Sequence, residues 1–327
     1  MADTEFEKRP FEIIREKLKG IKKAAVSAHA NPDGDAVGSV LALAMVLKQM
    51  GVEPVVLLEE YADRFNFIKG REFIYTGDYA QLEMPVFFAL DCGDKNRLGD
   101  RAVEVFDRTP LTFNIDHHMN NPEFATYNLV KPDASSASEI VFDIIKDSCE
   151  LTKEIATAIY AGIIYDTSGF KHSCTGVSTH LTAAALVEKG VDTAFIHSKM
   201  LYEHTTSQLK VMRCALKNMK TEGEVAWTVL SKEEMEECGA KNGDTDGVAE
   251  YLLNTESIEV SALLTEKKDN FVKISLRSKQ YNINKVAAFY GGGGHMLASG
   301  AGLEMPLSEA EKSVVEKIKE EIANEKQ

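Results

Sequence analysis

Two short polar segments carry side chains that bind hard metal ions. One is Asp116-His117-His118, and the other is HANPDGD at residues 29–35. Each follows a run of apolar residues typical of a buried strand. Asp91 follows a third apolar run, and Asp166 lies further along the chain. Together these residues predict a two-metal site that hydrolyses phosphate esters.

The first polar segment has a simpler interpretation, which its composition outweighs. NPDG at residues 31–34 is a strong β-turn signal. However, His29, Asp33 and Asp35 place an imidazole and two carboxylates on one tight loop. The apolar helix expected directly after this loop would direct its N-terminal amides to the same place, which favours anions. A metal and phosphate site is therefore the preferred interpretation.

The remaining candidates differ in how readily a structural role explains them. Asp91 alone would often be an exposed strand end, and Asp166 alone could end the apolar helix before it. Adjacent histidines are harder to explain, because Asp116 can serve as a good partner for only one of His117 and His118. A role for this pair with metal and substrate is the preferred interpretation.

The ligand types indicate which metals to expect. Oxygen and imidazole ligands without thiolates favour manganese or magnesium over structural zinc. Two such ions about 3.5–4 Å apart can activate water and clamp an in-line phosphoryl displacement. A bridging carboxylate must hold two cations that close together. Asp91, which lies between the first loop and the Asp116 segment, is the natural candidate.

A glycine run near the C-terminus is a separate signal. Four glycines precede a histidine, in the order Gly291, Gly292, Gly293, Gly294 and His295. Such a run is usually a flexible loop, but successive glycines can also expose backbone N–H groups that form an anion-binding nest. His295 can donate a hydrogen bond to a phosphate, and the Arg277 guanidinium can bind one through two hydrogen bonds.

Length and composition bound the class of protein. The chain has 327 residues, 44% of them apolar and 27% charged, which predicts a globular protein of two domains. Five scattered cysteines without a C-x-x-C pair indicate reduced thiols. The start MADTEFEKRP has no apolar h-region, and no apolar run could span a bilayer. We therefore expect a cytoplasmic location and no membrane partner.

The pattern of elements explains how distant residues can meet. Short apolar strands are predicted at 21–29, 54–58, 85–90 and 111–115, with helices between several of them. This alternation predicts an α/β fold whose N-terminal domain has a mostly parallel sheet flanked by helices. Ligands bind beyond the carboxyl ends of such strands, so His29, Asp91 and Asp116 should share one edge.

A smaller C-terminal α/β domain with a mixed sheet should follow. Apolar segments at 257–265 and 270–277 predict a β-hairpin within it. The expected boundaries are a catalytic domain at 1–190, a helical linker at 191–222 and a substrate-binding domain at 223–327.

With these residues assembled, the chain resembles the DHH phosphoesterase family with its C-terminal DHH-associated domain. Within the family it is most similar to the bacterial oligoribonuclease (nanoRNase) and pAp phosphatase subgroup. The resemblance runs from about residue 10 to 305. It rests on five segments in order, namely residues 29–39, DCGDKNRLG at 91–99, Asp116-His117-His118, GIIYDTSGF at 162–170, and SLRSK at 275–279 followed by GGGGH.

The resemblance implies a role for each matched residue. One metal would be held by His29, Asp33 and Asp91, and the other by Asp35, Asp91, His117 and Asp166. Asp116 would orient a histidine, and His118 would contact the scissile phosphate. Arg277 and Ser278, with Gly291 to His295, would bind the second phosphate or the nucleotide from the other domain across a cleft.

The expected activity is hydrolysis of short RNA oligonucleotides to mononucleotides and dephosphorylation of 3′-phosphoadenosine 5′-phosphate (pAp). Two Mn²⁺ ions are the expected cofactors, with Mg²⁺ or Co²⁺ as alternatives. A linear or cyclic dinucleotide phosphodiesterase, an exopolyphosphatase or pyrophosphatase, and a non-catalytic nucleotide-binding module remain open. The net charge of −14 argues against long duplex nucleic acid as a partner. The oligomeric state is open, a homodimer being one alternative.

Overall fold

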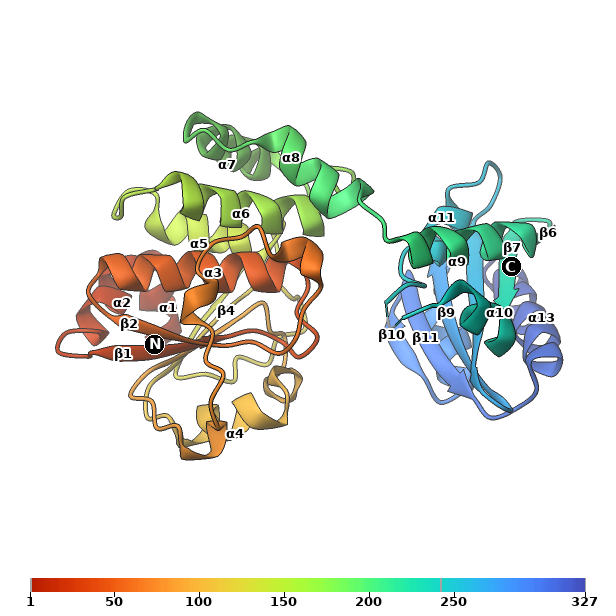
Figure 1. The fold of residues 1–327 in the computed structure, drawn as a ribbon, viewed down its shortest axis with the longest axis horizontal. Helices are drawn as coiled ribbons and strands as arrows, with labels where there is room; N and C mark the ends of the chain where they lie inside the picture. Colours follow the sequence, from red (N-terminus) through yellow and green to blue (C-terminus); the bar gives the residue numbers. More distant parts are fainter. Residues whose placement is uncertain (1, 242, 327) are drawn as a thin grey trace. The chain divides into compact units, whose positions relative to one another are not determined.

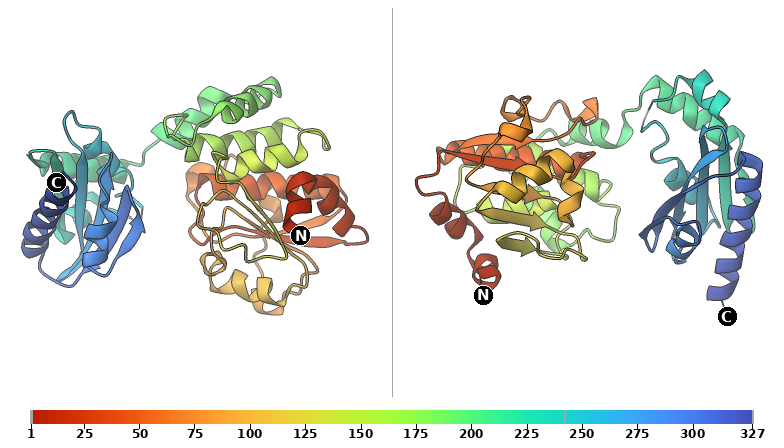
Figure 2. Two further views of the ribbon diagram at one scale, coloured as in Figure 1. Left: turned by 180° about the vertical axis from the view of Figure 1, so that it is seen from behind. Right: turned by 90° about the horizontal axis from the view of Figure 1, so that it is seen from below.

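The computed structural model describes residues 2–241 and 243–326, which form two compact units (Figures 1 and 2). The division falls between Glu203 and His204. Each unit has its own sheet and its own hydrophobic core. Across the described part of the chain, we find no helix with the length and apolar character that a bilayer span requires.

The first unit is a parallel α/β domain. Its five strands lie in the order β2-β1-β3-β4-β5, and every neighbouring pair is parallel. Its strands are β1 (Lys23–Ser27), β2 (Glu53–Leu57), β3 (Phe87–Leu90), β4 (Thr112–Asp116) and β5 (Tyr127–Val130). Its helices are α1 (Ala2–Lys8), α2 (Pro10–Lys17), α3 (Gly34–Gln49), α4 (Asp100–Arg108), α5 (Ala137–Ile145), α6 (Lys153–Asp166), α7 (Val177–Glu188) and α8 (Thr193–His197). Short helical turns are η1 (Asp63–Phe65), η2 (Arg71–Phe73), η3 (Tyr79–Gln81), η4 (Lys95–Leu98) and η5 (Ser198–Tyr202).

The sheet of the first unit is buried because helices cover both of its faces. Helices α3, α5 and α6 lie on one face and α4 on the other (Figure 1). Strand β3 is buried at every position, as expected of a central parallel strand. Helices α3 and α6 pack closely, since a Cβ at Gly38 would lie 2.6 Å from the Ala158 carbonyl oxygen. The predicted parallel sheet with flanking helices is confirmed.

The second unit contains a mixed sheet of six strands in the order β10-β11-β9-β8-β7-β6. Within the described residues of this unit, β7 and β8 pair in parallel and the other neighbouring strands pair antiparallel. Its strands are β6 (Lys220–Glu222), β7 (Val225–Leu230), β8 (Val260–Lys268), β9 (Phe271–Ser278), β10 (Gly293–His295) and β11 (Ala298–Leu303). Its helices are α9 (Thr206–Lys217), α10 (Lys232–Cys238), α11 (Val248–Leu253), α12 (Asn284–Phe289) and α13 (Leu307–Glu325).

The faces of the second sheet carry different helices. Helices α12 and α13 bury apolar side chains against one face, and α13 runs along it (Figure 2). Helices α9, α10 and α11 pack on the other face. The predicted hairpin is present as β8 and β9, and the predicted mixed sheet is confirmed. Within the predicted linker at 191–222, α8 lies in the first unit and α9 in the second.

Candidate active site

The predicted ligands of the first unit gather at one edge of its sheet. His29 lies two residues beyond the end of β1, Asp91 directly follows β3, and Asp116 is the last residue of β4. These three strands are adjacent and parallel, so their carboxyl ends meet. The sequence prediction that His29, Asp91 and Asp116 share this edge is confirmed.

The loop after β1 holds its polar groups by local hydrogen bonds. Asp33 caps α3, because its Oδ1 accepts hydrogen bonds from the Asp35 and Ala36 amides at 3.0 and 3.1 Å. The Nδ1–H of His29 donates to the Ala30 carbonyl at 2.9 Å. That leaves His29 Nε2, which lies 3.9 Å from Asp33 Oδ2, to face the site.

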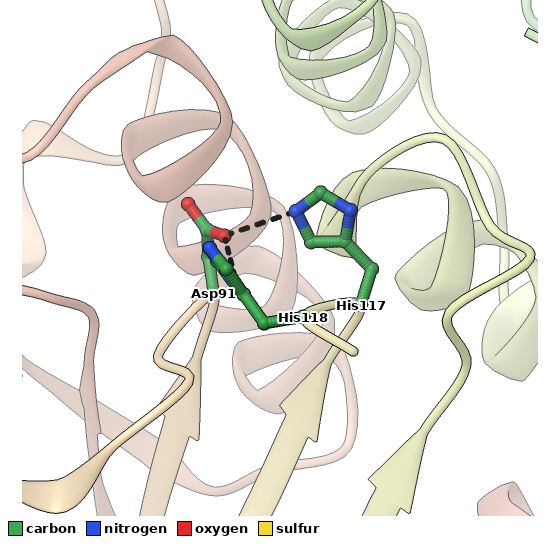
Figure 3. Close-up of side chains that lie close together, drawn as sticks. All are labelled: Asp91, His117 and His118. Carbon is green, nitrogen blue, oxygen red and sulfur yellow. Dashed lines mark ion pairs between the residues drawn. The ribbon is translucent and has the colours of Figure 1, made fainter. Parts of the chain in front are cut away.

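Asp91 lies at the centre of the arrangement. Its Oδ2 is 3.5 Å from His29 Nε2, and its Oδ1 is 3.4 Å from His117 Nε2. Oδ1 is also 3.8 Å from His118 Nδ1, and Figure 3 shows both histidines turned toward this carboxylate. The two carboxylate oxygens therefore face different groups of ligands. Asp91 also has a left-handed φ of 47°, a backbone conformation that costs energy in residues other than glycine.

A second group lies on the other side of Asp91. His117 Nε2 is 3.2 Å from Asp166 Oδ2, which stands at the end of α6. Asp35 is fully buried, and its two oxygens accept hydrogen bonds from the Ala137 and Ser138 amides at 2.6 and 2.9 Å. These amides form the N-terminus of α5, where a negative charge is stabilised.

The close carboxylates and imidazoles change each other's acidity. Burial and the charge of Asp91 raise the pKa of Asp35 to about 7, and burial and the charge of Asp35 raise the pKa of Asp166 well above its ordinary value. Burial opposes protonation of His29 and His117, but their interactions with Asp91 raise the pKa of each to about 9. Burial would raise the pKa of Asp91, yet His117 and His29 hold it below its ordinary value.

The donor set fits divalent cations. Among the residues that the structure describes, three groups have ligand atoms within 4.8 Å of one another, namely His29, Asp33 and Asp91; Asp35, His117 and Asp166; and Asp91, His117 and His118. Buried acids that repel one another need positive charge, and carboxylate and imidazole ligands suit hard or borderline ions. The neighbouring thiol of Cys92 points elsewhere and donates to the Asp94 carbonyl at 3.1 Å.

The predicted substrate-binding residues of the second unit have more exposed surroundings. Arg277, on β9, pairs through Nε with Glu250 and donates through Nη1 to the Leu276 carbonyl at 2.9 Å. Ser278 is buried, and its Oγ accepts hydrogen bonds from the Gln280 and Tyr281 amides. These hydrogen bonds of Ser278 thus order the turn after β9.

The glycine run is only partly a loop. Gly293 to His295 form the exposed strand β10, paired with β11. The Gly291 and Gly292 amides donate to the Ala288 and Ala287 carbonyls, both at 2.9 Å, and so close the end of α12. Two of the amides expected to form an anion nest are therefore already paired in this structure.

The sequence reasoning missed the partner of Asp35. The N-terminus of α5 receives this carboxylate from 102 residues away. A local signal was present, because Ser136 caps α5 by accepting the Glu139 amide at 3.0 Å, as expected for a serine three residues before a glutamate. The signal marks a helix start but does not reveal which anion lies there.

An α/β domain with these acid and imidazole groups at the carboxyl edge of a parallel sheet defines a protein built to hold divalent cations. Comparison with known families agrees with this. The model of the DHH family, N-terminal domain, matches residues 23–163, and the DHHA1 domain matches residues 222–324. The chain belongs to the DHH family; it is a phosphoesterase of that family, and hence a hydrolase.

Similar proteins span almost the whole chain. The bifunctional oligoribonuclease and PAP phosphatase NrnA of Thermus thermophilus is 30% identical over 315 residues, covering 95% of this chain and 94% of the relative. A probable bifunctional oligoribonuclease and PAP phosphatase NrnA of Streptococcus mutans is 26% identical, covering 89% and 93%. A crystal structure of an exopolyphosphatase-related protein from Bacteroides fragilis has a TM-score of 0.86 and 29% identity, covering 94% of each chain.

Proposed function

We propose that this protein hydrolyses short RNA oligonucleotides to mononucleotides and removes a phosphate from pAp, using two Mn²⁺ ions. The observation that carries the proposal is the position of Asp91, whose two oxygens face separate groups of ligands. The relatives named as oligoribonuclease and PAP phosphatase, which align over most of the chain, support this choice of substrates.

In this proposal two sets of residues hold the ions, and Asp91 belongs to both. One ion is held by His29, Asp33 and Asp91, and the other by Asp35, Asp91, His117 and Asp166. When bound, two divalent cations activate water and neutralise charge on the phosphate. Two amide hydrogen bonds from the N-terminus of α5 hold the Asp35 carboxylate in the position from which it would bind the second ion.

The remaining residues act on the substrate. Asp116 accepts the Nδ1–H of His118 at 2.7 Å, so His118 has its Nε2 left to contact the scissile phosphate. Arg277 binds the second phosphate or the nucleotide of the substrate, together with His295 and the glycine run. Arg277 Nε donates to the Glu250 carboxylate in this structure, and an anionic substrate would replace that partner.

A substrate panel tests this function. The purified protein is incubated with Mn²⁺ and pApA, pAp, cyclic di-AMP or pyrophosphate, and phosphate and mononucleotide are measured separately. We expect hydrolysis of pApA and pAp, and none in Asp91→Ala. Full turnover by Asp91→Ala would contradict the bridging role, and a clear preference for pyrophosphate or cyclic di-AMP would contradict the proposed substrates.

One observation favours a second candidate function. The structural neighbour from Bacteroides fragilis, similar over 94% of the chain with a TM-score of 0.86, is described as exopolyphosphatase-related. Release of phosphate from the ends of polyphosphate would use the same metal groups but no nucleotide. Adding polyphosphate to the same panel distinguishes the two, because an exopolyphosphatase would hydrolyse it faster than pAp at equal concentrations.

A further inference from the structure

The Asp116 carboxylate is bound by two different side chains. Its Oδ1 accepts the Nδ1–H of His118 at 2.7 Å. Its Oδ2 accepts the backbone N–H of His118 at 3.2 Å and the Nδ2 amide of Asn121 at 2.6 Å. Asp116 is fully buried, so these three donors replace its hydration. The orientation of His118 therefore depends on a carboxylate that Asn121 itself holds.

The amide of Asn121 uses both of its ends. Its Nδ2 donates to Asn114 Oδ1 at 2.7 Å, besides Asp116, while its Oδ1 accepts the Glu123 amide at 2.8 Å. A carboxylate can only accept and a backbone amide can only donate, so these partners fix which way the side chain points. Aspartate in this position would lose both donors and face Asp116 with a like charge.

The network continues to the neighbouring strand. Asn114 is fully buried in β4, and its Nδ2 donates to the Ala89 and Cys92 carbonyls at 3.2 and 3.3 Å. These carbonyls lie on either side of Asp91 at the end of β3. Asn121 thus ties the loop after β4 to a rigid part of the sheet, and a satisfied buried network of this kind restricts motion.

We propose that Asn121 is a positioning residue that sets the orientation of His118 through Asp116. The proposal rests on the proposed function, in which His118 contacts the scissile phosphate. Gly93 supplies the space for this arrangement, since a Cβ there would lie 2.9 Å from His118 Cβ. Because Nδ1 is engaged by Asp116, Asn121 determines where the Nε2 of His118 meets the substrate.

A double-mutant cycle tests the proposal. The values of kcat and KM for pAp with Mn²⁺ are measured for the wild type, Asn121→Ala, His118→Ala and the double variant. Asn121→Ala should lower kcat about 10–100-fold and change KM little, as expected for the loss of a residue that orients a site group. In the His118→Ala background the same substitution should change kcat less than about twofold. Asn120→Ala, at the exposed asparagine next to it, is the matched control and should leave kcat unchanged.

Two further measurements separate positioning from general structure. Mn²⁺ stoichiometry and the melting temperature should stay near the wild-type values in Asn121→Ala; if this variant does not fold, Asn121→Ser takes its place. An equal loss of kcat with and without His118, or loss of Mn²⁺ binding, would overturn the proposal.

A spectroscopic readout does not depend on the substrate. Imidazole ¹⁵N spectra, with His118 assigned from its absence in His118→Ala, should show the Nδ1–H form in the wild type and a changed pattern in Asn121→Ala. Unchanged spectra would overturn the positioning role even if pAp proved not to be a substrate. Failure of the wild type to hydrolyse pAp, with the expected change in the spectra, would contradict the proposed function alone.

Discussion

The site residues of the first unit are buried or half-buried and close to one another, whereas those of the second unit are largely exposed. The Asp91 side chain is 3% exposed and that of His29 is 10% exposed. By contrast, the Arg277 side chain is 30% exposed, and β10, which ends at His295, is exposed at every residue. The first unit confines like charges that require cations, whereas the second offers donors that an arriving anion can reach.

This contrast in burial indicates which kind of ligand each unit is suited to bind. Buried acids raise one another's pKa and leave a strong demand for positive charge, which suits a permanent cofactor. Exposed basic groups bind more weakly and exchange partners readily, which suits a substrate that must leave as product. Substitutions in the first unit should therefore affect metal binding and kcat, and those in the second mainly KM.

The largest expected effect is that of Asp91→Asn. Loss of the charge that faces both ligand groups should lower kcat by about 1,000-fold, equivalent to about 4 kcal/mol of transition-state stabilisation. Mn²⁺ stoichiometry, measured by titration calorimetry, should fall as well. Asp107→Asn is the matched control, because its exposed ion pair with Lys95 should contribute little. Wild-type Mn²⁺ binding in Asp91→Asn would contradict the expectation that substitutions in the first unit impair metal binding.

A smaller effect of a different kind is expected from Arg277→Ala. Loss of a charged hydrogen-bond donor to the substrate should raise KM about 10–100-fold and leave Mn²⁺ stoichiometry unchanged. Steady-state kinetics and calorimetry on the same preparation check both parts. Lys279→Ala, two residues away on the basic SLRSK segment, serves as the control. A fall in Mn²⁺ binding in Arg277→Ala would contradict the division of roles.

Gly162→Ala should weaken metal binding without removing a ligand. A Cβ at this position would lie 2.0 Å from Ser138 Oγ and 2.6 Å from Asp35 Oδ1, so Asp35 would have to move. We expect Mn²⁺ affinity to fall about 10-fold, as for other losses of ligand orientation. Gly176→Ala is the control, since its nearest contact would be Ser178 Oγ at 3.8 Å. Equal Mn²⁺ affinities of the two variants would contradict the inference that Gly162 leaves the space that the Asp35 carboxylate needs.

A prediction of a different kind concerns the stability of the metal-free protein. Folding raises the pKa of Asp35 from 3.8 to about 7 and those of His29 and His117 from 6.5 to about 9. The folded state therefore binds more protons than the unfolded state, and stability falls as pH rises. Between pH 6.5 and 8.5, with EDTA present, the free energy of unfolding should decrease by about 2 kcal/mol for each of the two histidines, and by a smaller amount for Asp35.

Urea denaturation at the two pH values measures this change. Saturating Mn²⁺ should reverse it, because the ligands must lose protons to bind a cation. A metal-free protein that becomes more stable toward pH 8.5 would show that the imidazoles are not held protonated by Asp91.

Much of the fold could be predicted because its signals are local. The strands around His29, Asp91 and Asp116 are short apolar runs, and a parallel sheet brings their ends to one edge. Strand β5 and helix α4 were not predicted, for different reasons. YNLV is too short to show a clear period, and its burial depends on neighbouring elements. DRAVEVFDR does carry a local helical signal, because the buried Ala102, Val105 and Phe106 have the spacing of one helix face, and the sequence prediction overlooked it.

The site could be predicted where the local sequence pattern is uncommon, and not where a common residue acquires its role through tertiary contacts. Two adjacent histidines after a strand are an uncommon pattern that the sequence alone reveals. Asn121 and Gly162 do not, because their importance lies in contacts with Asp116 and Asp35 that only the folded chain creates. The roles predicted for Ser278 and the glycine run stay predictions, and their local contacts in this structure are with the chain itself.

The central claim is that Asp91 joins two cation sites. Anomalous diffraction at the manganese edge from crystals grown with Mn²⁺ tests it most directly. We predict two peaks about 3.5–4 Å apart, each next to a different oxygen of Asp91. One peak, or two peaks that do not share this carboxylate, would contradict the account.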